Sequence, residues 1–456
     1  MKIVLIGLGT IGRTILSSLS GEGHNITIID ENREKVENLI ERFDVLGVVG
    51  NGACRDIQLE AGADAADLVG ALTRSDELNI LACLVARKIG ARNTIARVRN
   101  PEYSEQIVFM RGEFGLSMAV NPEYDAAREI SRIIRVPAAL KVDTFAKGRV
   151  DLVEVKIHRE HPLCGRRLSE LVSVLGVNVL VCAVKRGDDV IIPSGDFTPE
   201  EGDMIHITAS HQDLMSFFKK LGIQEKRIRS VMILGGGKIA YFLAKRLEGD
   251  GIGVKLVERD AERAEQLAEL LPKVMVIHGD ATDSDLLDEE GMAEMDAAVT
   301  LTGVDEENIM ISLYAAKNNV GKVITKINRP SVMKLLSNIG LECVVSPRTI
   351  TANSILRYLR GLEHSDSSSI ETLYKIVDGK VEAIEFVAAD GFDCLGVPIK
   401  QMKIRKNIII ACIIRGNRVI YPHGDDTIER GDAVIVVAKS EQAVHDLDDI
   451  LENPQK

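Results

Sequence analysis

The chain has 456 residues, more than one hydrophobic core usually organises, and it is expected to form about three to four domains. Apolar residues make up 45%, charged residues 27% and aromatic residues 4%, a balance typical of soluble α/β proteins. A net charge of −12 disfavours nucleic-acid binding, and no apolar run approaches the ~20 residues of a membrane span. Seven scattered cysteines without a C-x-x-C pair, and no signal-peptide pattern, predict a cytoplasmic protein.

The first part of the chain, residues 1–120, alternates short apolar runs with segments of helical period. Strands joined by crossovers of this length are parallel, and right-handed crossovers favour a doubly wound sheet of the Rossmann type. The predicted strands cover residues 2–7, 25–30, 45–49, 67–72, 93–98 and 117–120.

The same pattern returns 228 residues later, because residues 3–12 match residues 231–240. The match continues through the module to within one residue. Its polar positions pair Asp30 with Glu258, Asn51 with Asp280, Thr73 with Thr302, and Arg97 with Lys326. The chain is therefore predicted to contain two copies of one Rossmann module.

A smaller segment follows each Rossmann module, and it is also repeated. The apolar runs that begin at Asn178 and Asn407 both end in Arg-Gly, and a Pro-x-Gly-Asp pattern follows each, as in hairpins with glycine turns. We expect two small α+β domains, with connections at residues 137–149, 222–229 and 361–372. The predicted order is Rossmann, small, Rossmann, small, over residues 1–136, 137–222, 229–360 and 370–456.

The first module carries a complete dinucleotide-binding fingerprint. Gly7 permits a sharp exit from the strand, Gly9 lets backbone amides reach a pyrophosphate, and Gly12 lets the following helix sit close to the strand. The amino end of that helix favours phosphate. Asp30 ends the next strand, where a carboxylate accepts hydrogen bonds from ribose hydroxyls and repels a 2′-phosphate. The pattern therefore favours NAD(H) or an adenine nucleotide over NADP.

The second module carries a variant of this fingerprint. Gly235 and Gly237 keep the two leading glycines, but Ala240 replaces the third and Glu258 takes the acid position. Both replacements fall within what the fingerprint tolerates. We predict that this site binds more weakly or takes a different nucleotide.

Polar residues at the ends of later strands are further candidates. Thr73 and the segment from Asp76 to Asn79 fall at the edge where ligands enter a doubly wound sheet. Asp76 is equally suited to capping the helix that follows. Arg97 and Lys326 end a strand at the same edge, where contact with phosphate and a surface ion pair are both consistent with the sequence.

With these residues in place, the chain resembles the double-RCK proteins, the family of the peripheral regulatory subunits of Trk potassium-uptake systems. The resemblance covers nearly the whole chain and depends on both glycine motifs, the run from Arg97 to Glu102 and the order of four domains. Position by position, it implies a first nucleotide site at Gly7, Leu8, Gly9, Thr10, Ile11, Gly12, Asp30, Asn51, Thr73, Arg74 and Arg97. It implies a second site at Gly235, Gly236, Gly237, Lys238, Ile239, Glu258, Asp280, Thr302 and Lys326.

The same resemblance implies a homotetrameric ring, peripheral on the cytoplasmic face of the inner or plasma membrane. It would control a membrane-embedded potassium transporter subunit of the TrkH or TrkG type. NAD(H) is the expected ligand, with ATP or ADP as alternatives at either site, and neither catalytic residues nor a metal site are implied. Two alternatives stay open: an NAD-dependent oxidoreductase, and an RCK-type regulator of a different cation channel or antiporter. The nine histidines form no repeated acid/base pair, which disfavours the oxidoreductase.

Overall fold

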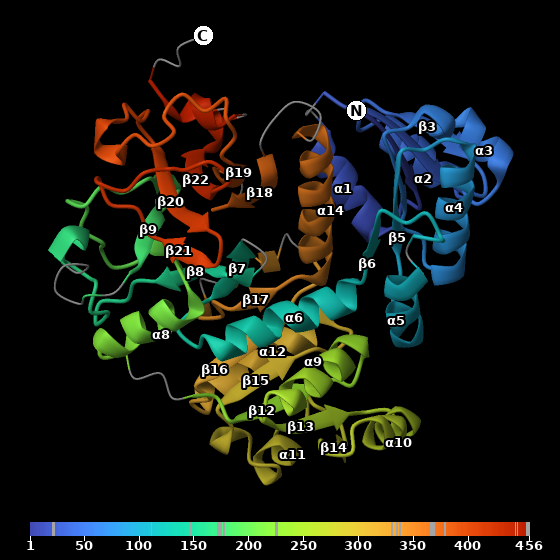
Figure 1. The fold of residues 1–456 in the computed structure, drawn as a ribbon. Coiled ribbons are helices and arrows are strands. Elements are labelled where there is room, and N and C mark those ends of the chain that lie inside the picture. The colour runs from blue at the N-terminus through green and yellow to red at the C-terminus, as the bar shows by residue number, and fades with distance from the viewer. Residues whose placement is uncertain are drawn as a thin grey trace. The chain divides into compact units, whose positions relative to one another are not determined.

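The first module is a six-stranded parallel sheet with the strand order β3-β2-β1-β4-β5-β6, which confirms the predicted doubly wound fold (Figure 1). The computed structural model describes residues 1–20, 23–110, 112–145, 148–170, 176, 178–223, 227–329, 332–333, 336, 339–364, 370–377, 380–442, 444 and 446–452. The strands of this sheet are β1 (Lys2–Ile6), β2 (Asn25–Asp30), β3 (Leu46–Val49), β4 (Leu68–Ala71), β5 (Asn93–Arg97) and β6 (Met118–Val120). The helices are α1 (Thr10–Leu19), α2 (Arg33–Ile40), α3 (Arg55–Glu60), α4 (Asp76–Ile89), α5 (Pro101–Met110) and α6 (Pro122–Arg135).

The sequence of the first module accounts for these elements. All residues of β1 except the first are buried, as expected for a central parallel strand. Helix α1 buries Ile11, Ile15 and Leu19, which recur at helical spacing on one face. The strand order reverses between β1 and β4, so the carboxyl ends of these two strands form the edge at which ligands bind in such sheets.

The second module repeats this architecture, with the strand order β14-β13-β12-β15-β16-β17. Its strands are β12 (Ser230–Leu234), β13 (Gly253–Glu258), β14 (Met275–His278), β15 (Ala297–Thr300), β16 (Lys322–Lys326) and β17 (Val344–Val345). Its helices are α9 (Lys238–Gly249), α10 (Ala261–Leu270), α11 (Ser284–Glu289), α12 (Asp305–Lys317) and α14 (Pro347–His364). The predicted duplication of one fold is confirmed.

Each small domain contains a five-stranded antiparallel sheet, with the orders β10-β9-β11-β8-β7 and β18-β19-β22-β20-β21. The first comprises β7 (Lys141–Phe145), β8 (Val150–Lys156), β9 (Leu180–Arg186), β10 (Asp189–Ile191), β11 (Met204–Ala209) and α8 (His211–Lys220). The second comprises β18 (Ile370–Ile376), β19 (Val381–Val387), β20 (Ile408–Arg415), β21 (Arg418–Ile420) and β22 (Ala433–Lys439). The two predicted hairpins are β9–β10 and β20–β21.

Two of the predicted connections contain regular structure. Residues 137–149 include β7, which pairs with β8 because Val142 and Phe145 are buried in the small-domain core. Residues 361–372 include the end of α14 and the start of β18, and residues 224–226 and 365–369 lie outside the described part of the chain. These segments contain many polar and small residues, which is why their composition predicted connections and not helices or strands.

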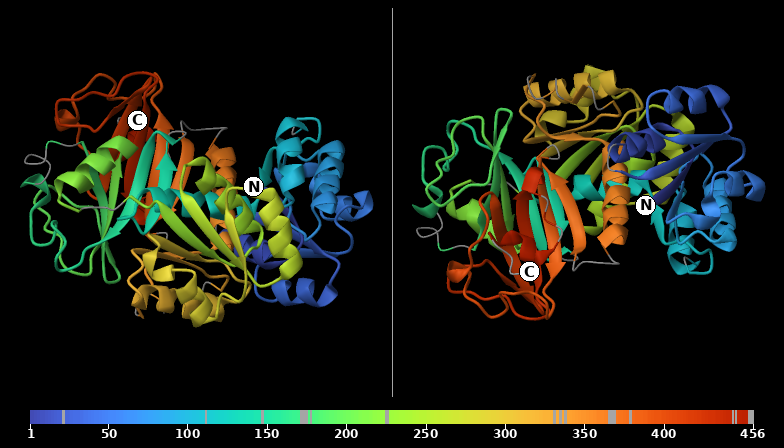
Figure 2. Two further views of the ribbon diagram at one scale, coloured as in Figure 1. Left: turned by 90° about the horizontal axis from the view of Figure 1, so that it is seen from below. Right: turned by 90° about the horizontal axis from the view of Figure 1, so that it is seen from above.

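The four domains pair as like with like. One compact unit joins Met1–Ile130 to Ser230–Leu359, and the other joins Ser131–Arg229 to Arg360–Lys456. In the second unit the two small sheets lie against each other (Figure 2). They share one buried cluster, which contains Phe145 and Cys182 from one sheet and Ala383 and Cys412 from the other. Chain order alone did not predict this pairing, because neighbours in the sequence belong to different units.

Within the first unit, each module sends its last helix against the other module. Tyr124 of α6 packs edge-on against Phe242 of α9, with ring centroids 5.5 Å apart. The Tyr358 hydroxyl of α14 donates a hydrogen bond of 3.2 Å to the Asn93 side chain, at the start of β5. Figure 1 shows α6 beside α9 and α14 beside α1.

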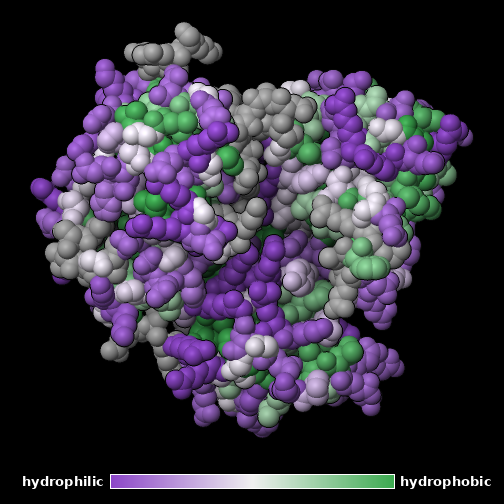
Figure 3. All heavy atoms as spheres, in the orientation of Figure 1, coloured by the Kyte–Doolittle hydropathy of each residue, from purple (hydrophilic) through white to green (hydrophobic). Residues whose placement is uncertain are grey.

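The face drawn in Figure 3 is mostly hydrophilic, with apolar residues in separated patches. Among the residues that the structure describes, no helix combines the length and the apolar character that crossing a membrane requires.

Candidate functional site

The first glycine loop, residues 7–12, has the geometry that the fingerprint predicts. Gly7 has a φ of 92°, and a Cβ there would lie 2.8 Å from the nitrogen of Thr73. A Cβ on Gly12 would collide with the carbonyl oxygen of Gly7. Gly9 immediately precedes α1, and no other described atom lies within 4 Å of the place a Cβ would take. Two glycines therefore permit close packing, and the third leaves the amino end of α1 open to a ligand.

Asp30 has a role in the loop itself that the fingerprint did not reveal. Its Oδ2 accepts a hydrogen bond of 2.8 Å from the Leu8 amide, and its Oδ1 accepts one of 3.0 Å from the Asn32 amide. The Lys35 ammonium lies 3.8 Å from Oδ1. The carboxylate thus fixes the glycine loop to the end of β2. Each carboxylate oxygen has a second lone pair, so Asp30 can still accept hydrogen bonds from a ribose.

Thr73 and Arg97 are joined by a buried asparagine. The Oδ1 of Asn79 accepts hydrogen bonds from the Thr73 amide (2.8 Å) and hydroxyl (2.7 Å). Its Nδ2 donates to the carbonyl oxygens of Thr73 (3.2 Å) and Arg97 (2.9 Å). Asn79 therefore holds the ends of β4 and β5 together, which places Thr73 and Arg97 at one point on the ligand edge.

One of the two interpretations of the sequence made Asp76 the cap of α4, and the structure contradicts it. The cap is Ser75, whose side chain accepts a hydrogen bond of 3.1 Å from the Leu78 amide. Asp76 instead accepts hydrogen bonds from the amides of Arg99 (2.8 Å) and Asn100 (2.7 Å). The Asp76 carboxylate thus accepts hydrogen bonds from two backbone amides in the segment after β5, and Ser75 caps the helix.

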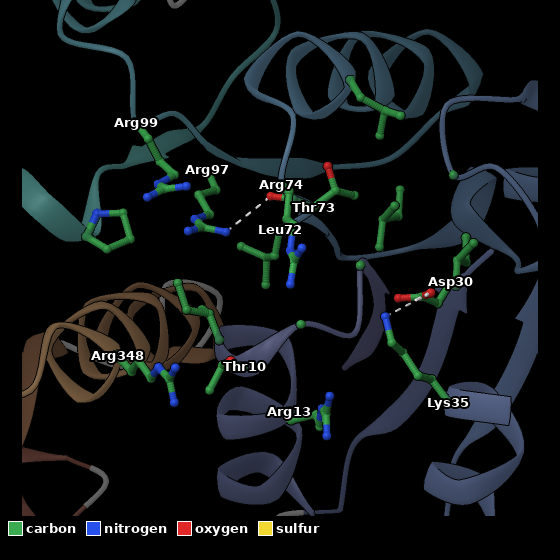
Figure 4. A pocket seen from close by; sticks show the side chains of 18 of the residues that line it. Thr10, Arg13, Asp30, Lys35, Leu72, Thr73, Arg74, Arg97, Arg99 and Arg348 are labelled. Atoms are coloured by element: carbon green, nitrogen blue, oxygen red, sulfur yellow. Dashed lines mark hydrogen bonds and ion pairs between the residues drawn. The ribbon is translucent and has the colours of Figure 1, made fainter. Parts of the chain in front are cut away.

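A cavity of about 630 Å³ opens over the first glycine loop (Figure 4). Seven basic residues and three acidic residues line it: Arg13, Lys35, Arg74, Arg97, Arg99, Lys326 and Arg348, with Asp30, Glu31 and Glu123. Five of its lining residues come from the second module: Ile239, Lys326, Asn328, Pro347 and Arg348. The excess of positive charge suits a ligand that carries phosphate.

The positive charges are not all neutralised within the described residues. Arg97 donates to the Thr73 carbonyl at 3.2 Å, but its Nε is buried and has no hydrogen-bond partner in the described part of the chain. Burial lowers the pKa of the Arg97 guanidinium, and the positive charge of Arg99 lowers it further. Arg99 itself is paired, since its Nη2 lies 2.6 Å from the Glu123 carboxylate, and this bond raises the pKa of Arg99. A buried, unpartnered guanidinium nitrogen is costly unless an anion completes the site.

The second glycine loop, residues 235–240, also packs closely on the neighbouring strand, but with a different acid and one more glycine. Gly235 has a φ of 106°, and a Cβ there would lie 2.9 Å from the Thr302 nitrogen. Glu258 Oε2 accepts a hydrogen bond of 2.6 Å from the Gly236 amide, as Asp30 does from Leu8. A Cβ on Gly236 would lie 2.7 Å from that same carboxylate oxygen. Glycine at position 236 therefore leaves the space through which the longer side chain of Glu258 reaches the loop.

Asp280 and Lys326, two residues of the predicted second site, form hydrogen bonds with other parts of the chain. Asp280 accepts hydrogen bonds from the amide (2.9 Å) and hydroxyl (2.8 Å) of Thr282, and the amide bond lowers the pKa of Asp280. Lys326 is 8% exposed and donates to the carbonyls of Leu301 (3.3 Å) and Thr302 (2.6 Å), and burial lowers its pKa. Lys326 is thus a buried ammonium bonded to carbonyls, and it forms no surface ion pair among the described residues.

The structure brings eleven of the predicted site residues to the first cavity: Gly7, Gly9, Thr10, Ile11, Asp30, Asn51, Thr73, Arg74, Arg97, Ile239 and Lys326. Leu8 and Gly12 do not line the cavity. Leu8 is fully buried and Gly12 packs on Gly7, so both support the loop. The predictions missed Arg13, Lys35, Arg99, Glu123, Asn328 and Arg348. The sequence held a signal for Arg99, which lies in the run from Arg97 to Glu102. It held none for Arg348, which belongs to the other module.

Comparison with known proteins identifies the family. The TrkA-N domain matches residues 3–122 and 231–347, and the TrkA-C domain matches residues 152–222 and 384–451. The Trk system potassium uptake protein TrkA of Vibrio alginolyticus is 34% identical over 455 residues, which cover 98% of each chain. The chain belongs to the TrkA family. The resemblance to regulators of the Trk type that the sequence suggested is confirmed.

Other relatives agree with this membership. The TrkA homolog of Archaeoglobus fulgidus is 33% identical over 439 residues, which cover 96% of this chain and 97% of the relative. Among solved structures, one described as the GsuK channel bound to NAD superposes with a TM-score of 0.63 at 19% identity, over 96% of this chain and 77% of that one. At this identity the likeness supports the fold. The two TrkA-N matches coincide with the two Rossmann modules, and the TrkA-C matches fall in the small domains.

Proposed function

We propose that this chain is a nucleotide-binding regulatory subunit of a Trk-type potassium-uptake system. The observation that carries the proposal is the full-length match to TrkA proteins, in which both modules and both small domains take part. The cavity over the first glycine loop supports it, because its glycines, its acid and its positive charges suit an adenine nucleotide. The proposed partner is a membrane-embedded potassium transporter subunit of the TrkH or TrkG type, reached from the cytoplasmic face.

The first site binds NAD(H), ATP or ADP through the residues predicted from the sequence. Asp30 binds the adenosine ribose, and the backbone of residues 9–11 binds the pyrophosphate at the amino end of α1. The second site binds more weakly or takes another nucleotide, because Glu258 and Ala240 alter its loop. The likeness in fold to the GsuK channel bound to NAD is in keeping with these ligands.

Regulation follows if the nucleotide binds one conformation of a ring of subunits more tightly than another. Each tenfold difference in affinity shifts the balance by about 1.4 kcal/mol, and several sites in a homotetrameric ring add their effects. The chain itself performs no chemistry on the nucleotide in this proposal.

Two measurements on the full-length chain test the proposal. Calorimetric titration should show binding of NADH or ATP, and the absorbance of bound NADH should stay constant with candidate small-molecule substrates. Efficient oxidation of NADH coupled to reduction of a substrate would contradict a regulatory role and favour the oxidoreductase.

The second measurement is potassium uptake in cells that lack their own Trk-type regulator. Co-expression of this chain with a TrkH- or TrkG-type subunit should restore uptake and should retain the chain on membranes. A chain that binds nucleotide but neither associates with that subunit nor changes uptake would point to a different channel or antiporter as partner.

A further inference from the structure

Two basic residues at the first site, Lys326 and Arg348, come from the other module, and Arg348 belongs to neither predicted site. Arg348 is in the first turn of α14 and lines the cavity over the first glycine loop. Its Nη1 donates a hydrogen bond of 2.9 Å to the carbonyl of Asn328, which is its single hydrogen-bond partner among the described residues. Most of the donor capacity of this guanidinium is therefore available to a ligand.

Arg348 lies next to the amino end of α1. A shallow groove joins it to Thr10, Arg13 and Thr14 of that helix, and it continues along Ser17 and Ser18. Figure 4 shows Arg348 beside Thr10, with Arg97 and Arg74 on the opposite side of the glycine loop and Asp30 at the other end of the cavity. A nucleotide with its ribose on Asp30 thus extends toward Arg348 and Arg97.

The corresponding position in the first module has the opposite charge. Glu123 and Arg348 both follow the proline that begins the last helix of their module, α6 in one and α14 in the other. Glu123 accepts two hydrogen bonds from Arg99, at 2.8 and 2.6 Å, and is therefore committed to a partner in its own module.

Helix α9, which follows the second glycine loop, carries different side chains at the positions that line this groove. Tyr241 and Phe242 of α9 occupy the positions of Arg13 and Thr14, and Tyr124 packs on Phe242. Aromatic rings therefore replace Arg13 and Thr14. The positions of the groove hydroxyls Thr10, Ser17 and Ser18 are held in α9 by Lys238, Lys245 and Arg246. The two loops therefore differ in the side chains that a nucleotide would meet beside the following helix.

We infer that Arg348 binds the terminal phosphate of a nucleotide held at the first site, so that this site discriminates between nucleotides by a contact from the other module. The inference deepens the proposed function and rests on nucleotide binding there. In NAD(H) the part beyond the pyrophosphate is an uncharged ribose with its nicotinamide ring. In ATP it is a further phosphate, which two arginines on opposite sides of the cavity are suited to bind.

The test compares ATP and NADH as ligands of the full-length chain by calorimetric titration. The first-site component is the part of the binding that Asp30→Ala removes. Arg348→Ala should weaken ATP at this site by about tenfold to a hundredfold, as expected for a charge-assisted hydrogen bond, and NADH by less than about threefold. Arg348→Lys should weaken ATP to an intermediate extent, because it keeps the charge but loses the paired donors.

Lys273→Ala is the matched control. It removes one positive charge from the same module, at an exposed residue before β14, where it lies at the amino end of a parallel strand and away from the ligand edge. It should leave both affinities unchanged. An equal loss of ATP and NADH affinity in Arg348→Ala, or no loss of either, would overturn the inference while nucleotide binding stands. If the native chain binds neither nucleotide, the proposed function fails and the inference with it.

Discussion

The two glycine loops differ far more than the sheets that carry them. Asn308 repeats the bonds of Asn79, since its Oδ1 accepts from the Thr302 amide at 2.8 Å and its Nδ2 donates to the carbonyls of Thr302 (3.2 Å) and Lys326 (3.1 Å). Both acids, Asp30 and Glu258, accept a hydrogen bond from the second residue of their loop. The duplicated sequence thus preserves what shapes each module.

The two glycine loops differ in the charged side chains around them and in the residues beside the amino end of the following helix. The first loop faces a cavity with seven basic residues, two of them contributed by the second module. The second loop leads into α9, which carries Tyr241 and Phe242 at the positions of Arg13 and Thr14. The repeated asparagines, Asn79 and Asn308, therefore support the fold, whereas Arg13 and Thr14, which differ from their counterparts, are candidates for ligand choice.

The largest expected effect is that of removing the acids. Asp30→Ala and Glu258→Ala each leave two backbone amides without an acceptor and should each lower the free energy of unfolding by about 2 kcal/mol. Only Asp30→Ala should also weaken first-site nucleotide affinity, by at least about tenfold, through the lost ribose contacts. Chemical denaturation and calorimetric titration measure the two effects separately.

Asp30→Asn provides a control for this pair, since it keeps one side-chain oxygen as an acceptor and should retain part of the stability. Equal loss of nucleotide affinity in Asp30→Ala and Glu258→Ala would show that both sites bind alike. The proposed difference between the loops would then be wrong.

A smaller effect is expected from exchanging the third position of the loops. Gly12→Ala places a Cβ against the Gly7 carbonyl, so the loop must shift and first-site affinity should fall several-fold. Its net effect on unfolding should be about 1 kcal/mol, because alanine's better helix propensity offsets part of the clash. Ala240→Gly should cost about 1 kcal/mol through helix propensity and leave first-site affinity unchanged.

Fluorescence titration with NADH and thermal unfolding of both variants provide the measurements. If Gly12→Ala binds NADH as well as the native chain does, the close approach of α1 to its strand is not what shapes the phosphate site.

The sequence predicted the parts of this molecule that depend on local pattern. The strands of the first module, including β1 and β5, lie within a residue or so of their predicted bounds, because buried parallel strands are short, apolar and regularly spaced. Asp30 was identified because its distance from Gly12 is characteristic. The pairing of modules was not predictable, since it depends on contacts between residues far apart in the sequence, such as that of Tyr124 with Phe242. For the same reason Arg348 was missed.

The smallest expected effect separates Lys326 from its counterpart Arg97. Burial lowers the pKa of Lys326 below its usual value of 10.5, so the folded chain holds this proton less tightly than the unfolded chain. The contribution of Lys326 to stability is therefore fully present above about pH 10.5 and is lost as the pH falls through the lower pKa of the folded state. As the pH rises toward 10.5, the native chain should gain stability relative to Lys326→Met, because the buried ammonium loses its proton and with it the cost of desolvation. Arg97→Met should show no such dependence, because arginine stays charged throughout this range. Thermal unfolding at several pH values checks both, and parallel curves for the native chain and Lys326→Met would mean that the buried ammonium carries no desolvation cost.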